Sequence, residues 1–342
     1  MSRRAALGWL GVPVLMVAIV AVAVIHAVYS RPAVGRAGAK PVLFTVTPGE
    51  SFSRLAGRLE GLRLIDRPRL VTLWAWLRGW DRQVKAGTYR FVRGHRAKDI
   101  VAALVNGDVL TVSVTIPEGF RYAQIAGALA DALAPEASVD SLAFSRLSTD
   151  PEVLDALDVE GPSLEGYLFP DTYVIPWGMT AEEIAGMMRA RLAEVFDADM
   201  RRRVEALGMT VHQTLTLASI IQAETRLPEE FALVSAVYHN RLSRGMRLEA
   251  DPTVAYAMGG YRSRLYYKDL ETESPYNTYQ HDGLPPGPIC APGRAAIVAA
   301  LYPDTVCKAV YFVAKGDGGH VFSLTLDDHL RAVEMVKKAG SD

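Results

Sequence analysis

"LTLASIIQAETRLPEE" (residues 215–230) predicts a helix bound for the core of the protein. Eight of its first nine residues are apolar or small, and then a carboxylate follows. The residues that share one face of such a helix are Leu217, Ile220, Ile221 and Glu224. An acid on a buried face costs free energy unless it is paired or has a function. Glu224 is therefore either the partner of a cation such as Arg226 or a chemically active group.

The composition of the 342-residue chain argues against several classes of function. Half of the residues are hydrophobic, and 37 basic residues nearly balance 38 acidic ones, so no basic excess points to nucleic acid. Cys290 and Cys307 fit no zinc or redox spacing and are expected as free thiols or one incidental pair. The seven histidines lack ligand spacing, so we expect no metal and no cofactor. A phosphate-binding loop and a serine-nucleophile elbow are also missing from the sequence.

Residues 1–30 are predicted to form a short cytoplasmic tail and a transmembrane anchor. The run from Ala5 to Tyr29 carries no formal charge and follows Arg3 and Arg4. It exceeds the roughly 20 apolar residues that a bilayer crossing needs. A cleavable signal has a shorter apolar region of about 7–15 residues, which favours an uncleaved anchor. We therefore expect a single-pass protein of the cell inner (plasma) membrane with its body on the periplasmic, extracytoplasmic side.

Three segments follow the predicted anchor. Residues 31–41, rich in Pro, Gly and Ala, are expected to be a linker. Residues 42–110 alternate short strand and helix patterns, and resemble the LysM-like modules that bind glycan in many wall proteins. This module would either bind glycan or serve as a spacer near the membrane. Residues 111–342 predict a larger, helix-rich domain, and the expected fold class of the whole is α+β.

Two stretches of the larger domain are expected to be loops, namely residues 134–162 and residues 251–293. The second is rich in Pro, Gly, Asn and Tyr and has little periodicity. Long ordered loops commonly carry function. Carboxylates beside aromatic and amide-rich loops are typical of proteins that bind and cut sugar polymers.

Five blocks of the sequence share their order and spacing with a known family. They are LEGYLFPDTY (164–173), ASIIQAET (218–225), VYHNRLSRGMRLEADPTVAYAMG (237–259), YNTYQHDGLPPGPI (276–289) and GGHVFS (318–323). The chain resembles the MltG (YceG-like) family of endolytic murein transglycosylases from about residue 40 to the C-terminus. This resemblance implies a catalytic domain at 111–342 that cuts peptidoglycan between MurNAc and GlcNAc within glycan strands. Such enzymes leave 1,6-anhydro-MurNAc ends instead of adding water.

The resemblance implies that Glu224 is the catalytic acid/base. Many family members have Glu-Lys-Glu-Thr where this chain has QAET (222–225), so the first acid is absent here and the second is kept. Glu-Thr also resembles the Glu-Ser pair that carries the catalytic acid in other lytic transglycosylases. One carboxyl suffices because the sugar supplies its own nucleophile. The apolar neighbours on the helix face would raise the pKa of Glu224, as an acid in this role requires.

Further candidate substrate contacts are Glu165, Asp251, Asn277, Thr278 and Tyr279. The last three offer an amide, a hydroxyl and a ring to an N-acetyl sugar. Asp251 would either contact the glycan or cap a helix. Glu165 would either face the same cleft or belong to a buried structural network.

Two alternatives to the transglycosylase stay open from sequence. One is a non-catalytic peptidoglycan-binding scaffold of the wall-synthesis machinery, although retention of Glu224 favours the enzyme. The other is a hydrolase that uses a second carboxylate, such as Asp251 or Glu165, to activate water. Expected partners are peptidoglycan glycan strands and the membrane, with peptidoglycan synthases as candidate partners and no nucleic acid.

Overall fold

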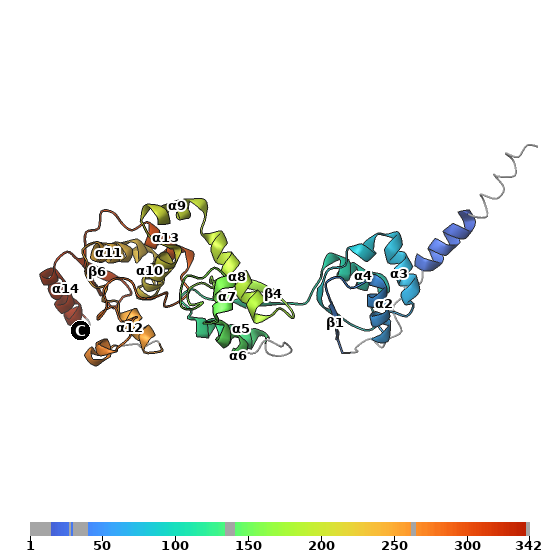
Figure 1. Ribbon diagram of the computed structural model, residues 1–342, viewed down its shortest axis with the longest axis horizontal. Helices are drawn as coiled ribbons and strands as arrows, with labels where there is room; N and C mark the ends of the chain where they lie inside the picture. The colour runs from blue at the N-terminus through green and yellow to red at the C-terminus, as the bar shows by residue number, and fades with distance from the viewer. Residues whose placement is uncertain (1–14, 27–28, 30–39, 134–140, 261–264, 340–342) are drawn as a thin grey trace, which may run out of the picture. The chain divides into compact units, whose positions relative to one another are not determined.

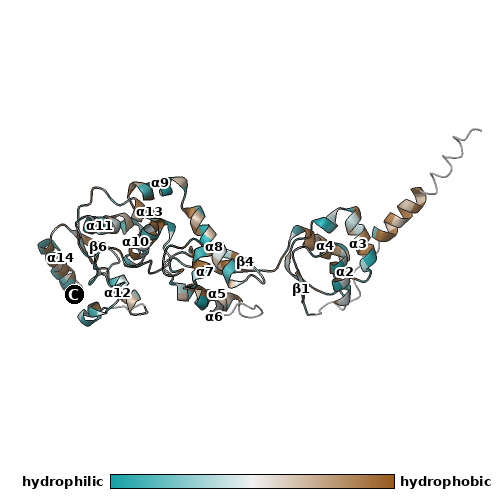
Figure 2. Cartoon of the chain, in the orientation of Figure 1, coloured by the Kyte–Doolittle hydropathy of each residue, from teal (hydrophilic) through white to brown (hydrophobic). Residues whose placement is uncertain are grey.

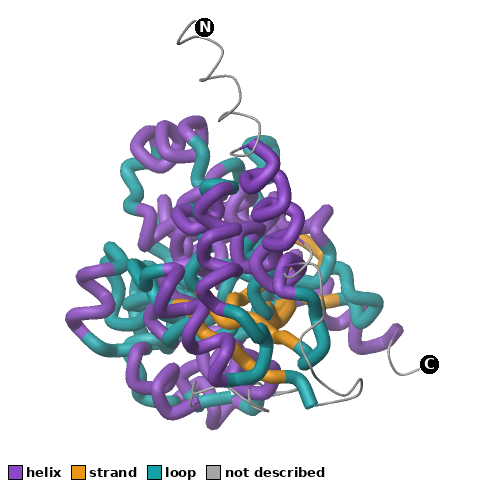
Figure 3. Tube along the Cα trace, turned by 90° about the vertical axis from the view of Figure 1, so that its right-hand side faces the viewer, coloured by secondary structure: helices purple, strands orange, loops and turns teal. Residues whose placement is uncertain are grey.

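Helix dominates the protein, and its strands are few and short (Figure 1, Figure 3). The computed structural model describes residues 15–26, 29, 40–133, 141–260 and 265–339. The chain divides into two compact units, the first made of residues 1–112 and 174–178 and the second of residues 113–173 and 179–342. Within the described residues the strands form three two-stranded sheets, which pair β1 with β2, β3 with β4 and β5 with β6. The predicted α+β class is confirmed.

In the first unit, a strand pair and three helices enclose an apolar core. The elements are β1 (Val42–Val46), α2 (Phe52–Gly61), α3 (Pro68–Leu77), the 3-10 turn η1 (Trp80–Arg82), β2 (Gly87–Phe91) and α4 (Ala97–Asn106). β1 and β2 pair antiparallel, with Val42 opposite Phe91. The buried face of α2 consists of Phe52, Leu55, Ala56 and Leu59. This is the i, i+3, i+4, i+7 spacing of an amphipathic helix, and the predicted pattern of strands and helices in this segment is confirmed.

The N-terminal segment joins this first unit. Residues 15–26 are helical, and Ile25 and Tyr29 are buried in the same core as α2 and α4. No helix among the described residues is both long enough and apolar enough to cross a membrane. The predicted anchor at 5–29 lies partly outside those residues, so it stays a prediction.

The second unit is built from helices around α10, while parts of β3 and β4 fall in the first unit. In chain order the remaining elements are β3 (Thr111–Thr115), α5 (Tyr122–Leu133), α6 (Ser141–Leu147), α7 (Pro151–Ala156), β4 (Thr172–Pro176), α8 (Ala181–Val195), α9 (Ala198–Ala206), α10 (Val211–Glu224), η2 (Pro228–Glu230), α11 (Phe231–Ser243), α12 (Asp251–Ala257), η3 (Tyr267–Glu271), α13 (Arg294–Leu301), β5 (Tyr311–Ala314), β6 (His320–Ser323) and α14 (Leu326–Ala339). α10 packs against α13, α11 and α12.

The opening stretch of sequence forms the helix predicted for it. α10 begins with a capping box in which the Thr210 hydroxyl accepts from Gln213 N while the Gln213 side chain accepts from Thr210 N. Every residue from Thr214 to Ile221 is buried. The buried hydroxyls along it are satisfied locally, as when Ser219 Oγ donates to the Thr216 carbonyl at 2.7 Å. A helix buried on all sides needs neighbours all round, and this explains its central place.

The two predicted loops contain more helix than the sequence pattern indicated. Residues 141–147 form α6 and residues 151–156 form α7, while residues 134–140 lie outside the described residues. α7 is short but well capped, because Asp150 accepts from Glu152 N at 2.9 Å ahead of Pro151. The 251–293 stretch likewise contains α12 and η3. Helices of only five to seven residues are too short to produce a readable period.

Candidate active site

Glu224 is the last residue of α10 and is partly exposed. Since the helix is buried as far as Ile221, its final turn brings the acid from the core to the surface of the unit. Tyr238, on α11, donates from its hydroxyl to Glu224 Oε2 at 3.1 Å. The Tyr238 ring is buried and packs edge-on against Phe312 of β5. The acid is therefore carried by one packed helix and hydrogen-bonded from another.

Burial raises the pKa of Glu224 to about 7, and the charge of Asp251 acts in the same direction. The Tyr238 hydrogen bond and the Arg241 guanidinium lower this pKa to a lesser extent. The C-terminal end of a helix also disfavours a carboxylate, because the macrodipole is negative there. Near neutral pH both the acid and the carboxylate are accessible, as proton transfer in two directions requires. Glu224 forms no ion pair with the described residues, and Arg226 is exposed.

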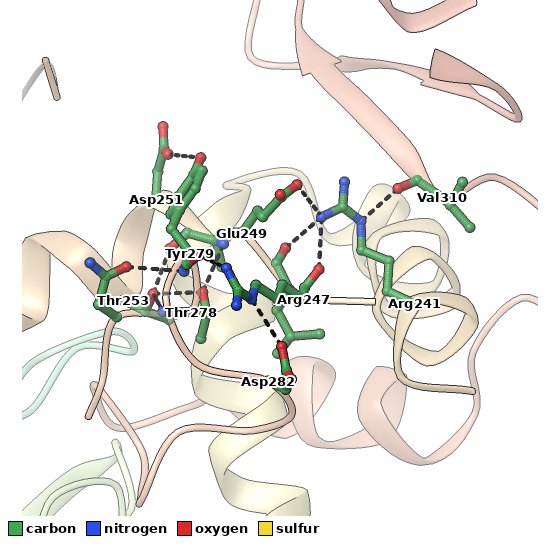
Figure 4. Close-up of polar contacts among 12 residues, drawn as sticks. Arg241, Arg247, Glu249, Asp251, Thr253, Thr278, Tyr279, Asp282 and Val310 are labelled. Atoms are coloured by element: carbon green, nitrogen blue, oxygen red, sulfur yellow. Dashed lines mark hydrogen bonds and ion pairs between the residues drawn. The ribbon is translucent and has the colours of Figure 1, made fainter. Parts of the chain in front are cut away.

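Asp251, the first residue of α12, forms a hydrogen-bonded pair with Tyr279 (Figure 4). The Tyr279 hydroxyl donates to Asp251 Oδ1 at 2.7 Å. The capping role that the sequence left open for Asp251 is not found, because Ala250 holds the cap position and no side chain caps the helix. Burial and the Asp251 charge raise the pKa of Tyr279, so its proton stays in place to be donated. The pair is electrostatically coupled to Glu224 through Asp251.

Asn277 and Thr278 are buried, and their polar groups are used inside the protein. Asn277 Nδ2 donates to the carbonyls of Leu270 and Thr272 at 2.9 and 2.8 Å, and its Oδ1 accepts from Tyr279 N. The Thr278 hydroxyl accepts from Ala250 N at 3.0 Å and meets the Thr253 hydroxyl at 2.9 Å. In this geometry the two residues hold the loop that presents Tyr279, and Tyr279 alone of the three is partly exposed.

Arg241 fastens the segment that leads into Asp251, as Figure 4 shows. The Arg241 Nη1 donates to the carbonyls of Arg247 and Leu248 and pairs with Glu249 Oε2 at 2.8 Å. Its Nε donates to the Val310 carbonyl, ahead of β5, at 2.6 Å. Glu249 has a positive φ of 48°, a conformation that costs a non-glycine residue free energy and needs support from its surroundings. Arg241 supplies that support.

Glu165 lies in a second buried carboxyl environment. Its Oε1 accepts from Tyr122 N at 2.9 Å, and burial raises the pKa of Glu165 to about 7. That pKa is lowered in part by the Tyr122 hydrogen bond, the Arg121 guanidinium and a hydrogen bond with the Tyr256 side chain. Glu165 is thus held in the buried network that the sequence offered as one alternative, and within the described residues no hydrogen bond or ion pair joins it to Glu224.

The structure brings together sequence blocks that lie far apart in the chain. Gly166 has a φ of 77°, and a Cβ there would lie 2.3 Å from the Cβ of Pro288. Ser219 of α10 accepts from Ile289 N at 3.0 Å, and its carbonyl accepts from the Cys290 thiol. The blocks 164–173 and 276–289 therefore lie next to block 218–225, which forms the end of α10.

Two residues of this site, Tyr238 and Arg241, were not singled out from the sequence. They lie three residues apart on α11, a spacing that puts both on one helix face. The sequence did offer one signal, because Arg241 continues the apolar i, i+3, i+4, i+7 spacing of Val234, Val237 and Tyr238, and charged residues are rarely buried without a purpose. Their partners could not be read from sequence, because the bonds reach Glu224 and Val310 from different elements.

Thiol and metal chemistry have no arranged site in the described part of the chain. Cys290 and Cys307 are both free, and Cys290 is buried. No group of three or more His, Cys, Asp or Glu side chains there is placed to hold a metal ion.

Comparison with known proteins places this arrangement in a family. The sequence model of the YceG-like family matches residues 44–335, which cover the candidate site and most of the chain. The chain belongs to the YceG-like family.

Its relatives carry a consistent name. A Bacillus subtilis protein named "Endolytic murein transglycosylase" is 32% identical over 311 residues, covering 86% of this chain and 84% of the relative. A Streptococcus pneumoniae protein of the same name is 27% identical and is covered over 58% of its own length. A crystal structure of a yceG-like protein from Listeria monocytogenes is 30% identical, with a TM-score of 0.59 over 85% of this chain and 99% of that one.

Proposed function

We propose that this protein is an endolytic lytic transglycosylase that cleaves the MurNAc–GlcNAc bond within peptidoglycan strands, with Glu224 as its general acid/base. The relatives named as endolytic murein transglycosylases support the reaction class. The observation that carries the residue assignment is the environment of Glu224. It is a partly exposed carboxyl at the end of a buried helix, with a pKa raised to about 7 and one hydrogen-bond donor.

In the first step, protonated Glu224 donates its proton to the departing glycosidic oxygen, and the bond from that oxygen to C1 of MurNAc breaks. The resulting carboxylate then takes the proton of the MurNAc C6 hydroxyl, whose oxygen closes onto C1. The products are a GlcNAc 4-hydroxyl and a 1,6-anhydro-MurNAc end. No water is consumed, and the acid is regenerated for the next cycle. The Tyr238 hydrogen bond stabilises the carboxylate formed between the two steps.

Asp251 and Tyr279 would act beside this group. Asp251 favours protonated Glu224 through its charge, and Tyr279 holds the Asp251 carboxylate with a hydrogen bond. The partly exposed Tyr279 ring is the candidate contact for sugar. Asn277, Thr278 and Glu165 are assigned to supporting the loops around the site, since they are buried and already hydrogen-bonded.

The decisive experiment compares wild-type protein with Glu224→Gln on purified glycan strands. The substitution keeps the size and shape of the side chain but removes the transferable proton. General acid/base catalysis is worth about 10²–10⁴-fold in rate, and one group serves both steps, so we expect a loss at the upper end of that range. The matched control is Glu229→Gln, an exposed acid in η2 that should cleave at the wild-type rate. Glu165→Gln, Asp251→Asn and Asn277→Ala should cost less than Glu224→Gln, because they would position groups rather than move protons.

Mass spectrometry of the products separates the transglycosylase from its two alternatives. We expect fragments ending in 1,6-anhydro-MurNAc with no oxygen taken from labelled water. Reducing ends that carry solvent oxygen would identify a hydrolase. Binding of glycan without any cleavage by the wild type would identify a scaffold. A Glu224→Gln variant that cleaves at close to the wild-type rate would refute the residue assignment.

The proposal includes a membrane anchor at residues 5–29 and a LysM-like module after it. The length of the uncharged run supports the anchor, and the strand–helix–helix–strand order from β1 to β2 supports the module. The body would then lie outside the cytoplasm, near its peptidoglycan substrate and within reach of peptidoglycan synthases. Sequencing the N-terminus of the mature protein tests the anchor, since a start beyond residue 20 would show that the segment is removed.

A further inference from the structure

The α3 helix presents an apolar face to solvent. Leu73, Trp76 and Leu77 are 41%, 60% and 52% exposed, and their i, i+3, i+4 spacing places them side by side. The opposite face of α3 is filled by Val71 and Trp74, which are buried in the core of the first unit. Exposed apolar side chains that lie next to one another usually mark a contact surface, whereas single exposed ones do not.

The apolar N-terminal helix contacts α3 at Trp74, three residues before Leu77. The rings of His26 and Tyr29 lie 5.4 and 5.3 Å from the ring of Trp74, on the other side of α3. A hollow beside Trp74 is lined by residues of the helix, from Ala18 to His26. Beyond this contact the helix exposes its large apolar residues, and Figure 2 shows it in brown where it leaves the unit near α3. The exposed apolar helix and the exposed apolar face of α3 therefore belong to the same part of the first unit.

The charge of the first unit is opposite to that of the rest of the body. Residues 40–112 contain 13 basic and six acidic residues, a formal charge of +7, whereas residues 113–342 contain 20 basic and 32 acidic residues, a formal charge of −12. Four exposed arginines lie in α3 or next to its ends in the sequence, namely Arg67, Arg69, Arg78 and Arg82. The Arg78 guanidinium lies over the rings of Trp74 and Trp80, at 4.9 and 5.5 Å from their centroids. Tryptophan with flanking arginine is the composition of a membrane–water interface, and a basic surface is attracted to anionic lipid headgroups.

We propose that the first unit lies on the anionic lipid surface, with Leu73, Trp76 and Leu77 inserted at headgroup level and the flanking arginines on lipid phosphates. The inference rests on the membrane anchor of the proposed function, because the anchor delivers this face to the bilayer. It assigns the face of α3 to lipid rather than to glycan. Any glycan contact of the module would then come from another of its surfaces.

The test uses the full-length protein reconstituted in vesicles of phosphatidylcholine and phosphatidylglycerol with brominated acyl chains, which quench tryptophan fluorescence at short range. We expect stronger quenching for wild type than for Trp76→Phe, the difference being the signal of Trp76. Leu73→Ser/Leu77→Ser keeps Trp76 as the reporter, and its tryptophan should be quenched little more than that of Trp76→Phe. Raised salt or omission of phosphatidylglycerol should also reduce the difference between wild type and Trp76→Phe, because the arginine contribution is screened. The matched control is Leu326→Ser/Leu330→Ser on α14, where two similarly exposed leucines are changed in the other unit.

Flotation of the same vesicles and cleavage of soluble glycan strands separate the possible failures. All variants should float, through the anchor, and should cleave soluble strands as the wild type does. Flotation with equal quenching of wild type and Trp76→Phe would overturn the lipid-facing assignment while leaving the anchor intact. Absence of flotation would overturn both the anchor and this inference, without bearing on the glycan chemistry. Loss of binding to purified peptidoglycan by Leu73→Ser/Leu77→Ser, with quenching unchanged, would assign the face to glycan instead.

Discussion

At the scale of single residues, the site depends on the competing effects that act on one carboxyl group. Burial and the Asp251 charge raise the pKa of Glu224, whereas Tyr238 and Arg241 lower it. Burial alone would favour the acid so strongly that the carboxylate needed in the second step would be costly. The hydrogen bond from Tyr238 stabilises that carboxylate. The balance near pH 7 suits a group that both gives and takes a proton.

Removing the two neighbours of Glu224 should move the pH dependence of activity in opposite directions. Tyr238→Phe deletes a donor that lowers the pKa of Glu224, so the alkaline limb of kcat/KM should shift to higher pH. Asp251→Asn deletes a like charge that raises this pKa, so the same limb should shift to lower pH. Tyr279→Phe leaves Asp251 charged and serves as the control, with a smaller shift. Profiles of kcat/KM on soluble glycan strands measure all three, and shifts of the same sign in the first two variants would contradict the account.

Glu224 should also make stability fall as pH rises. Below about pH 4.5 the carboxyl is protonated in both states, and between 4.5 and about 7 only the unfolded state releases the proton. The stability contributed by the acid form is therefore lost between about pH 4.5 and about pH 7, and above that the folded state holds a poorly solvated carboxylate. Glu224→Gln avoids that loss. At pH 8 its free energy of unfolding should exceed that of the wild type by on the order of 1–3 kcal/mol, after allowance for the partial exposure of Glu224. Denaturant unfolding at pH 5 and pH 8 checks this, and an equal difference at both values would exclude the linkage.

At the scale of elements, the site forms where short irregular segments pack against α10. The turn at Gly166 packs against Pro288 and Cys290. Ser219 of α10 forms hydrogen bonds with the same 288–290 segment. On the other side, Arg241 of α11 fastens the segment leading into Asp251. Each of these segments is irregular, so its conformation depends on tertiary contacts rather than on a repeating backbone pattern.

Gly166→Ala should therefore destabilise the protein severely. The new Cβ would lie 2.3 Å from Pro288 Cβ and 3.2 Å from the Cys290 carbonyl oxygen, and φ of 77° is unfavourable for alanine. Overpacking and backbone strain together predict a loss of about 2–5 kcal/mol in the free energy of unfolding. Gly208→Ala is the matched control, since its φ is also positive at 64° but no atom lies within 4 Å of the added Cβ. We expect about 1–2 kcal/mol there, and equal losses would show that the contact with Pro288 does not matter.

At the scale of the whole molecule, the two units differ in charge and in role. The acidic second unit contains all the residues assigned to chemistry, and the basic first unit contains none of them. Peptidoglycan cleavage should then survive removal of the first unit, while association with the wall or membrane should weaken.

A soluble fragment of residues 111–342 should retain residual cleavage of glycan strands. It contains α10, α11 and the loops around Glu224 in full. The measurement is product release by the fragment and by full-length protein on the same soluble strands, with circular dichroism to establish that the fragment is folded. A folded fragment without any activity would place an essential group in residues 1–110.

The sequence by itself determined the helix–strand pattern of residues 42–110, the α+β class, the buried course of α10 and the place of Glu224 on the helix face of Ile220 and Ile221. Each of these follows from local periodicity, which a chain expresses wherever an apolar face must be covered. Only the tertiary structure decided that Tyr238 donates to Glu224 and that Asp251 pairs with Tyr279 instead of capping α12. It also decided that the Asn277 amide forms its hydrogen bonds within its own loop. These outcomes depend on groups 14 and 28 residues apart meeting in space, or on short loops whose backbone has no period. A hydrogen bond between distant groups leaves no trace in the spacing of residues, because its geometry exists only after the helices have packed.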